Sequence, residues 1–339
     1  MVFRRERERL FAHAWQMLGP ASQVAAPGAY VAAELGGHKV LVRRGADGVL
    51  HAFRNVCRHR GAPLLAEGAG TCDRLRCPYH HWLYDDDGSL RAAPAFGEAD
   101  DFRFEDWPLA AIHVETWRGL LFVAVDPVET LVEQLGDTVA ELADEPIERY
   151  TATDAAQLDF DANWKIYTDN FVEGYHIPGI HPRFFAAIRF NEFETTAHDG
   201  LVRMTAPPRE GLFYRGKWLW MWPNWSLSLF NGGMNTSRID PLSHERTRLH
   251  YHFYFADTSE AARPERERTV AANLDVVRED FAICLGTHRN YETGGYTRGP
   301  LSPRHEQGVA YFQRRLRAVL DDDTASVTRI RDHRQETNG

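Results

Sequence analysis

Two short segments of this 339-residue chain each place a cysteine and a histidine close together. The first reads Cys57-Arg-His59, and the second, which follows after seventeen intervening residues, reads Cys77-Pro-Tyr-His80. Each segment therefore offers one thiolate and one imidazole. A two-iron cluster with two cysteines on one iron and two histidines on the other needs this set of ligands. The pattern is the strongest signal in the sequence, and it constrains the fold around it.

A structural zinc site is the main alternative for these residues. Zinc ligand pairs usually have two to four residues between them, whereas a single residue separates Cys57 from His59. The spacing therefore favours the iron–sulfur cluster over zinc and over chance. Cys72 lies outside both segments, and we expect it to be a small buried hydrophobe.

The composition is that of a globular protein. The chain is 43% hydrophobic and 26% charged, which excludes a disordered chain. Its 39 basic and 48 acidic residues give a net charge of −9, which argues against a general nucleic-acid binder. No run approaches the ~20 apolar residues of a membrane span, and the N-terminus lacks the pattern of a signal peptide. We expect a cytoplasmic protein that contacts neither membranes nor nucleic acids, with cysteines that bind metal rather than form disulfides.

Turn signals divide the chain into two regions. Between Tyr30 and Val125, short apolar runs alternate with turn residues such as Asp47-Gly48, which is typical of β-strands and hairpins. Asp126-Pro127 ends this pattern, and a polar helical linker at 128–143 follows. We expect an all-β domain over residues 1–126, including an N-terminal helix at 4–17, and an α+β domain over 127–339. The elements expected in the second domain are helices at 163–176, 264–290 and 305–320, and antiparallel strands at 217–222, 225–230, 234–239 and 246–255.

A second group of ionisable residues begins within the expected helix at 163–176. Asp169, Glu173 and His176 are spaced by four and three residues, so they would share one face of a helix. Pro178-Gly179 breaks that helix, and the break would let His181 reach the same ion as His176. Two such histidines need a carboxylate to complete the facial triad of a mononuclear non-heme Fe(II) site.

The expected helix at 264–290 offers that carboxylate. Asp280 falls within an apolar stripe, between Val276 and Cys284, whereas Glu279 falls on the opposite side, toward solvent. A carboxylate on an apolar face needs a partner, which is either a metal ion or a buried arginine or histidine. The residues by themselves leave both partners open.

Three tryptophans, Trp218, Trp220 and Trp222, alternate along one expected strand. Such a face suits a flat ring, or a quaternary ammonium group held by cation–π attraction. Sheet packing is the simpler interpretation, because aromatic side chains are common in the cores of sheets. The pattern favours packing and leaves a substrate pocket as the alternative.

The segments CRHRGAPL and CPYHHWLYDDDG resemble the two cluster-binding loops of Rieske [2Fe-2S] domains. This resemblance implies that Cys57, His59, Cys77 and His80 bind the cluster. The family usually has glycine where His81 stands, so the second loop departs from the family pattern.

The segment from Asn163 to Pro182 resembles the iron-binding segment of the Rieske non-heme iron oxygenases, in which a D/E-x2-H-x4-H motif and a later helical aspartate bind iron. The resemblance extends from about residue 5 to about residue 320, and it implies His176, His181 and Asp280 as the iron ligands. It also implies a helix-grip catalytic domain, in which an antiparallel sheet curves around a long helix. Both the choline and carnitine type monooxygenases and the aromatic-ring hydroxylases are similar in this segment.

The resemblance further implies partners. In this family a separate NAD(P)H-dependent reductase, sometimes with a ferredoxin, supplies the electrons, and this chain has no Gly-rich dinucleotide fingerprint of its own. Members assemble as homotrimers or as α3β3 complexes. An acid three residues before the first iron histidine bridges to a cluster histidine of a neighbouring subunit, which here implies Glu173 and His80. Asp169 would either assist Glu173 or form a salt bridge on the helix face.

We therefore predict a terminal oxygenase that activates O₂ and hydroxylates a small organic substrate, by ring hydroxylation or by oxidative N- or O-demethylation. One alternative is a Rieske electron-transfer protein without oxygenase activity, and another is a zinc-stabilised binding module. The intact set of His176, His181 and Asp280 disfavours the first alternative, because an electron carrier needs no O₂ site.

Overall fold

The computed structural model describes residues 2–209 and 214–321, which form two units that divide after Pro127. The first unit begins at Phe11, and the second combines the described residues before Phe11 with those after Pro127. The division lies one residue from the boundary expected at 126, but the N-terminal residues belong to the other side of it.

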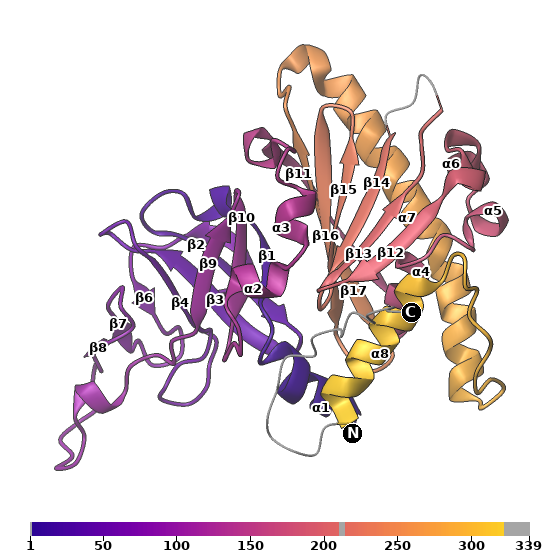
Figure 1. The fold of residues 1–339 in the computed structure, drawn as a ribbon. Helices are drawn as coiled ribbons and strands as arrows, with labels where there is room; N and C mark the ends of the chain where they lie inside the picture. The colour runs from indigo at the N-terminus through magenta and orange to yellow at the C-terminus, as the bar shows by residue number, and fades with distance from the viewer. Residues whose placement is uncertain (1, 210–213, 322–339) are drawn as a thin grey trace, which may run out of the picture. The chain divides into compact units, whose positions relative to one another are not determined.

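Three antiparallel sheets form the first unit (Figure 1). Their strand orders are β4-β3-β2-β5, β1-β10-β9 and β6-β7-β8. Gly36 and Gly37 both have positive φ, which allows the tight turn between β2 and β3. The prediction of an all-β first domain is confirmed. The strands are β1 Gln16–Pro20, β2 Ala29–Leu35, β3 His38–Arg44, β4 Leu50–Arg54, β5 Gly68–Thr71, β6 Leu75–Arg76, β7 Leu83–Tyr84, β8 Leu90–Ala92, β9 His113–Trp117 and β10 Leu120–Ala124.

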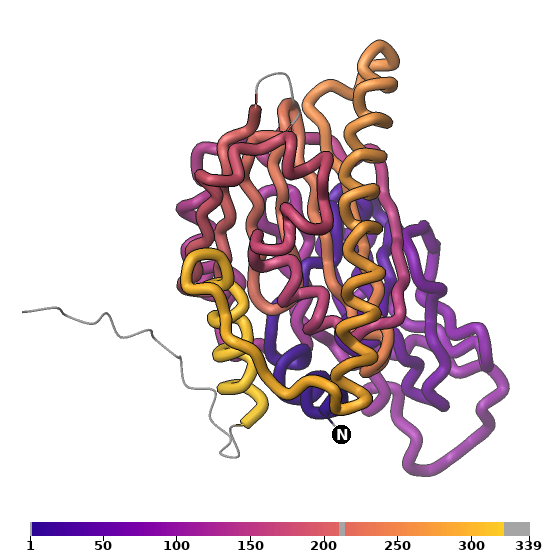
Figure 2. The backbone as a smooth tube through the Cα atoms, turned by 90° about the vertical axis from the view of Figure 1, so that its right-hand side faces the viewer, coloured from indigo at the N-terminus to yellow at the C-terminus, as the bar shows by residue number. Residues whose placement is uncertain are grey.

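A seven-stranded antiparallel sheet forms the centre of the second unit, in the order β11-β17-β16-β15-β14-β13-β12. The long helix α7, Arg263–Glu292, runs along this sheet (Figures 1 and 2). This is the predicted helix-grip arrangement, and it is confirmed. The strands are β11 Thr151–Phe160, β12 Glu194–His198, β13 Leu201–Thr205, β14 Tyr214–Met221, β15 Trp225–Phe230, β16 Gly233–Pro241 and β17 Thr247–Phe255.

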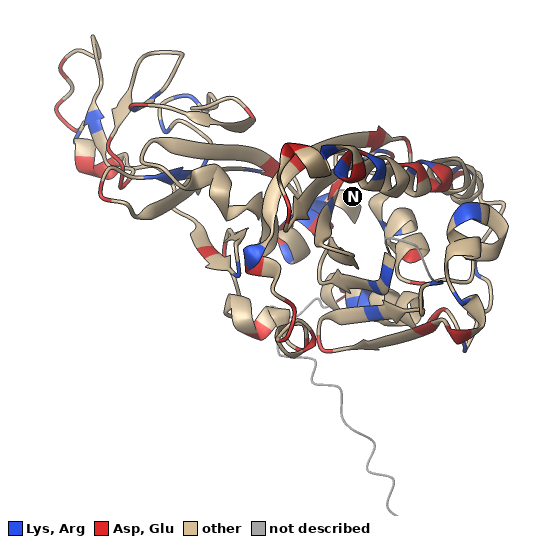
Figure 3. Cartoon of the chain, turned by 90° about the horizontal axis from the view of Figure 1, so that it is seen from above, with Lys and Arg blue, Asp and Glu red and all other residues tan. Residues whose placement is uncertain are grey.

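The side-chain pattern of α7 explains its position. Its buried residues recur every three to four positions and include Val277, Asp280 and Cys284, so one stripe is buried. Acidic and basic residues lie along the rest of the helix, as Figure 3 shows. Phe281 of α7 stacks on Phe160 of β11, with 4.6 Å between the ring centroids.

The segment expected as one helix at 163–176 is shorter and is followed by two short helices. Helix α4, Trp164–Phe171, begins where the Asn163 side chain accepts a hydrogen bond from the Lys165 N–H at 3.1 Å. It ends before Gly174, where an added Cβ would lie 2.4 Å from the Phe193 ring. Helices α5, Ile177–Ile180, and α6, Pro182–Ala187, follow. Glu173 and His176 therefore lie beyond α4, and the prediction that they share a helix face with Asp169 is wrong.

The N-terminal helix expected at 4–17 is also wrong in extent. The structure has α1, Val2–Arg5, then a π-helical turn over Glu6–Phe11, and the strand β1 begins at Gln16. The Glu6 carboxylate is buried, accepts a hydrogen bond from Trp164 Nε1 at 3.1 Å and pairs with Lys165. These contacts hold the segment against α4 of the second unit, which is why it does not belong with the β-domain.

The remaining helices are α2 Leu131–Leu135, α3 Thr138–Glu141 and α8 Gln307–Asp321. The linker expected at 128–143 thus contains two short helices rather than one. Helix α8 packs on the sheet through Phe312, which contacts both Trp164 and Trp220. None of the helices in the described ranges is long and apolar enough to span a bilayer.

Candidate functional site

Two loops of the first unit bring the four predicted cluster residues together. Cys57 and Cys77 are buried free thiols in the same core cluster, and burial raises the pKa of Cys77. His59 and His80 are half-buried, and their Nδ1 atoms lie 3.1 Å apart. The thiols lie in the interior and the imidazoles nearer the surface, and both cysteines are free of disulfides. This donor set fits a two-iron cluster with one Cys₂ and one His₂ iron.

The two loops share one backbone plan. In each, a residue four positions after the cysteine donates its backbone N–H to the carbonyl oxygen of that cysteine, at 3.0 Å for both Gly61 and His81. Both residues have positive φ, 74° at Gly61 and 59° at His81. A left-handed conformation is freely available to glycine and strained for histidine. This explains why the position of His81 favours glycine, and the unusual residue leaves the loop intact.

Tyr84 supports the cluster loops, and the sequence interpretation did not single it out. Its hydroxyl oxygen accepts a hydrogen bond from the Arg58 N–H at 3.1 Å. Its own proton is therefore free to point at Cys57 Sγ, which lies 3.3 Å away. Hydrogen bonds to the sulfur ligands are one of the means by which a protein sets the reduction potential of such a cluster.

In the second unit, His176, His181 and Asp280 form a compact cluster. One ligand atom from each lies within 4.8 Å of the other two. His176 comes just before α5, His181 just after it, and Asp280 from the buried stripe of α7. The break at Pro178-Gly179 does turn the two imidazoles toward each other, with 5.1 Å between their ring centroids.

The hydrogen bonds around this cluster show that it fits a cation. His181 Nδ1 donates to Glu279 Oε2 at 2.7 Å, so its Nε2 atom carries a lone pair. That lone pair faces Asp280 Oδ1 at 3.0 Å, and this buried oxygen has no hydrogen-bond partner among the described residues. His176 repeats the arrangement, because its Nδ1 pairs with Glu173 while its Nε2 lies 3.8 Å from the same oxygen. Lone pairs that converge in a buried site need a positive ion between them.

The carboxylates that surround His181 also favour a proton on it. Burial opposes a charge on His181, but hydrogen bonds and negative charge from Asp280 and Glu279 outweigh it, so the pKa of His181 is raised. A metal ion must displace this proton, because it binds the neutral imidazole.

Glu279 is the residue that the sequence interpretation placed wrongly. It was expected on the solvent side of α7, but its carboxylate reaches His181, and its side chain is 35% exposed. Glu279 and Asp280 point about 100° apart around the helix axis. The glutamate side chain is nevertheless long enough to reach His181. A carboxylate that holds a metal-binding imidazole in this way fixes its tautomer and orientation.

Asp169 lies outside the cluster and outside the adjoining pocket. Its Oδ2 accepts a hydrogen bond from Gln313 Nε2 of α8 at 2.8 Å, and its Oδ1 is buried without a hydrogen-bond partner in the described part of the chain. Burial raises the pKa of Asp169 to about 7, although the bond from Gln313 works against this. A salt bridge on an exposed helix face, one of the two roles left open for Asp169, is not formed with any described residue, because α8 covers this side of α4.

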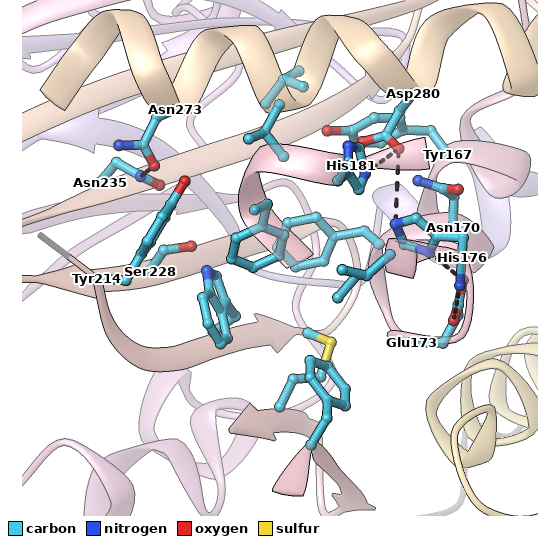
Figure 4. A pocket seen from close by; sticks show the side chains of 18 of the residues that line it. Tyr167, Asn170, Glu173, His176, His181, Tyr214, Ser228, Asn235, Asn273 and Asp280 are labelled. Carbon is cyan, nitrogen blue, oxygen red and sulfur yellow. Dashed lines mark hydrogen bonds and ion pairs between the residues drawn. The ribbon is translucent and has the colours of Figure 1, made fainter. Parts of the chain in front are cut away.

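A pocket adjoins the cluster on the side of the sheet that α7 covers (Figure 4). Its wall contains Phe184 of α6, which meets Trp218 edge-on at 5.2 Å and Tyr214 at 5.1 Å between ring centroids. Asn170, which the sequence interpretation passed over, lines the pocket beside His176.

Only one of the three predicted pocket tryptophans lines this cavity. Trp218 does, whereas Trp220 is fully buried against Phe312 of α8, with 5.4 Å between ring centroids. Trp222 lies under the guanidinium of Arg315, 4.7 Å from its ring centroid. For Trp220 and Trp222 the favoured interpretation, sheet packing, describes the structure and the pocket alternative is wrong, because α8 covers the sheet at their end of β14 and the pocket does not extend that far.

An all-β domain with a Cys₂His₂ pair of loops, followed by a helix-grip domain with a His₂Asp cluster, defines an oxygenase that carries its own iron–sulfur cluster. Comparison with known protein families leads to the same class. Residues 14–112 match the Rieske [2Fe-2S] domain, and residues 147–212 and 191–322 match the catalytic domain of the ring hydroxylating alpha subunit. The chain therefore belongs to the alpha subunits of the Rieske non-heme iron oxygenases, and its cofactors are a Rieske cluster and a mononuclear iron.

Similar proteins include monooxygenases of quaternary ammonium compounds. The carnitine monooxygenase oxygenase subunit of Escherichia coli K12 is 30% identical, over 95% of this chain and 91% of that protein. The chloroplastic choline monooxygenase of Spinacia oleracea is 28% identical, over 93% of this chain and 75% of that protein. A solved quaternary ammonium Rieske monooxygenase, described in terms of carnitine oxidation and inter-subunit electron transfer, is 27% identical, with a TM-score of 0.82 over 94% of this chain and 92% of that one.

Proposed function

We propose that this chain is the terminal oxygenase of a multicomponent system and inserts one oxygen atom into an N-methylated, quaternary ammonium type substrate. In this proposal Cys57, His59, Cys77 and His80 hold the [2Fe-2S] cluster. His176, His181 and Asp280 hold the mononuclear iron. The observation that carries the proposal is that lone pairs of His176, His181 and Asp280 converge on one point, beside a pocket with an aromatic wall.

The cofactors, when bound, supply one-electron transfer and reductive activation of O₂. The residues of this chain supply the rest. Glu173 and Glu279 hold the two imidazoles by their Nδ1 atoms and leave both Nε2 atoms for the metal. Trp218 and Phe184 exclude water from the space beside the cluster and offer aromatic faces to a cationic or planar substrate.

The overall reaction sets the requirement for partners. A substrate C–H bond, O₂, two electrons and two protons give an alcohol and water. On a methyl group next to nitrogen, the resulting alcohol splits at the carbon–nitrogen bond into formaldehyde and the demethylated amine, and a proton is released where the nitrogen was quaternary. The electrons come from NAD(P)H through a separate reductase, with or without a ferredoxin. The similar protein of Escherichia coli is named as an oxygenase subunit, which supports this division of labour.

One feature favours an ammonium substrate over an aromatic ring: the similar proteins act, by their names, on choline and carnitine. The aromatic wall is compatible with such a substrate, because it suits cation–π attraction. Ring hydroxylation remains the competing outcome, because the same wall accepts a planar ring.

We also propose a homotrimer, with or without a β subunit, that works in the cytoplasm. In it, Glu173 connects the iron site to His80 of a neighbouring subunit. The buried Glu173 carboxylate pairs with His176 and accepts the backbone N–H of Tyr175, so it already holds one end of such a path.

Two inactive variants, His80→Cys and Asp280→Ala, should regain about a quarter of the wild-type activity when mixed equally in exchanged trimers, because half of the iron sites and half of the neighbouring clusters are intact. No recovery would mean that electrons travel within one chain.

The experiment that tests the function is a turnover assay with the iron-loaded protein, a surrogate reductase, NADH and O₂. The panel contains choline, carnitine, simpler N-methyl amines and flat aromatic compounds, and mass spectrometry identifies the products. We expect an oxygenated or dealkylated product only from the N-methylated compounds. A ring diol or phenol as the sole product would replace the proposal with ring hydroxylation, and electron uptake without any product would support the electron carrier.

A further inference from the structure

The pocket has a second polar end, away from the candidate iron ligands. Figure 4 shows the labelled side chains in two groups, with Asn235, Asn273, Tyr214 and Ser228 in one and the histidines with Asp280 in the other. In this view, apolar side chains that line the pocket lie between the two groups. A substrate that fills the pocket therefore meets hydrogen-bonding groups at both of its ends.

The sheet builds one side of this polar end. Trp218 of β14 pairs with Ser228 of β15, and Ser228 pairs with Asn235 of β16. Partners across antiparallel strands point to the same face, so these three side chains form a row on the floor of the pocket. Asn235 is 2% exposed and Ser228 is 8% exposed, so their polar atoms are removed from bulk water.

Helix α7 builds the other side. Asn273 precedes Asp280 by seven residues, which is two turns, so the two lie on the same stripe about 10 Å apart along the helix axis. Asn235 Nδ2 donates to Asn273 Oδ1 at 3.1 Å across the gap between sheet and helix. The distance between the iron ligand and this amide pair therefore limits the substrate to a small molecule.

The orientation of both amides is fixed by the chain. Asn273 Nδ2 donates to the backbone carbonyl oxygen of Thr269 at 2.8 Å, and a carbonyl can only accept. Asn273 Oδ1 must then face Asn235 Nδ2. The Asn235 carbonyl oxygen remains as an acceptor for a ligand, and the second N–H of each amide remains as a donor. The nearby Tyr214 hydroxyl stays neutral, because burial raises its pKa.

Among the described residues that line the pocket, the acidic side chains lie at the iron end. These acids are Glu173 and Asp280, and none of the described lining residues is lysine or arginine. The undescribed segment 210–213 also contains no lysine or arginine in its sequence. A buried carboxylate without a cationic partner is strongly unfavourable, whereas a neutral group can hydrogen-bond to the amides.

We propose that Asn235, Asn273 and Ser228 bind an uncharged hydrogen-bonding group of the substrate, such as a hydroxyl or an amide, and thereby exclude substrates with a carboxylate at that end. The inference rests on the proposed function, because it takes the pocket to be the substrate site. It separates this chain from an enzyme built for a zwitterionic substrate.

Equilibrium binding tests the proposal without turnover. Two probe series, one on a trimethylammonium scaffold and one on a phenyl scaffold, each carry a short chain that ends in hydroxyl, amide, carboxylate or methyl. Calorimetric titration of the anaerobic, iron-loaded protein should show the hydroxyl or amide member of one series binding at least tenfold more tightly than its carboxylate member. Equal or tighter binding of the carboxylate, or no binding by any probe, would overturn the proposal.

Variants of the amide pair assign the effect to these residues. Asn273→Ala should weaken the amide or hydroxyl probe several-fold and leave the methyl probe unchanged. Asn273→Lys should invert the preference in favour of the carboxylate. Asn290→Lys is the matched control, because Asn290 is an exposed residue of the same helix and the change in net charge is the same. Equal weakening of the polar and methyl probes by Asn273→Ala would show that the pair is only structural.

The proposal and the proposed function fail in different ways. If the probes are distinguished by binding but none is oxygenated in the turnover assay, the amide site stands and the proposed reaction is wrong. If N-methylated compounds are oxygenated with no preference against a carboxylate, the reaction stands and the amide site is wrong.

Discussion

The two candidate metal sites are assembled in different ways. The cluster site uses two short loops with the same hydrogen bond from a positive-φ residue back to the cysteine carbonyl. The iron site uses the irregular segment around α5 and the helix α7, and 98 positions separate His181 from the Glu279 that holds it. One site is local in the sequence, and the other exists only after the sheet and α7 have packed.

This difference shows where each site is vulnerable. The cluster loops depend on backbone conformation within a few residues. The iron site depends on the core that fixes α4 and α7, and on the carboxylates that orient its histidines. The following predictions act on these separate dependences.

The largest effect on stability should come from the core between the sheet and α8. Trp220→Ala removes a fully buried side chain that packs on Phe312, so we expect a loss of about 3–5 kcal/mol in the free energy of unfolding. Trp218→Ala, in the pocket wall, should change substrate binding with a smaller loss of stability. Denaturant unfolding measures the stability of both variants, and probe titrations measure their substrate selectivity. If Trp220→Ala changed the selectivity and Trp218→Ala did not, Trp220 would belong to the pocket.

Asp169 provides a pH-dependent test of the same core. Its folded pKa of about 7 lies above the unfolded value near 3.8, so the folded state binds the proton more tightly and stability falls as pH rises between these values. Asp169→Asn should therefore raise the free energy of unfolding at pH 8, by up to about 4 kcal/mol, with the gain vanishing below about pH 4. Unfolding curves over this range check it. Unchanged stability with a large loss of turnover would instead place Asp169 in the electron path.

The iron site should be sensitive to Glu279. Glu279→Gln keeps the shape but weakens the acceptor for His181 Nδ1, so we expect iron affinity to fall about 10–100-fold. Competition with a metal chelator measures the affinity. The control is Asp275→Asn, because Asp275 is an exposed acid on the same helix. An equal loss of iron affinity in both variants would mean that net charge, and not the bond to His181, causes the effect.

The smallest effect belongs to the second cluster loop. His81→Gly relieves a left-handed conformation at a non-glycine residue, so the first unit should become more stable by about 1 kcal/mol. Gly61→Ala, at the equivalent place in the first loop, should lower stability by a similar amount. Thermal melts of the two variants show whether the loops are equivalent, and opposite signs are required.

The local site could be predicted from the sequence in detail, and the distant site only in part. The candidate ligands of both cluster loops follow from contiguous motifs, as do strands β14 to β17 and the approximate extent of α7, whereas β11, β12 and β13 were not predicted. Asp280 was found because a carboxylate on an apolar helix stripe needs a partner. The resemblance to a known family then selected metal over arginine or histidine.

Features that depend on tertiary packing could not be predicted. Glu279 was misplaced because the angle on a helix says nothing of how far a glutamate reaches. The sequence could not separate Trp218 from Trp220, because only the position of α8 shows where the pocket ends. Glu6 was assigned to the wrong unit because its partners, Trp164 and Lys165, are more than 150 positions away in the chain.

Iron and sulfide analysis of Asp280→Ala tests the central claim, that one chain holds two independent metal sites, most directly. The wild-type protein should contain about three irons per chain, two in the cluster and one mononuclear. The variant should keep about two irons, an unchanged visible spectrum of the cluster and a folded structure, because the substitution removes a buried charge. A variant that keeps the third iron, or one that loses the cluster together with it, would contradict this account.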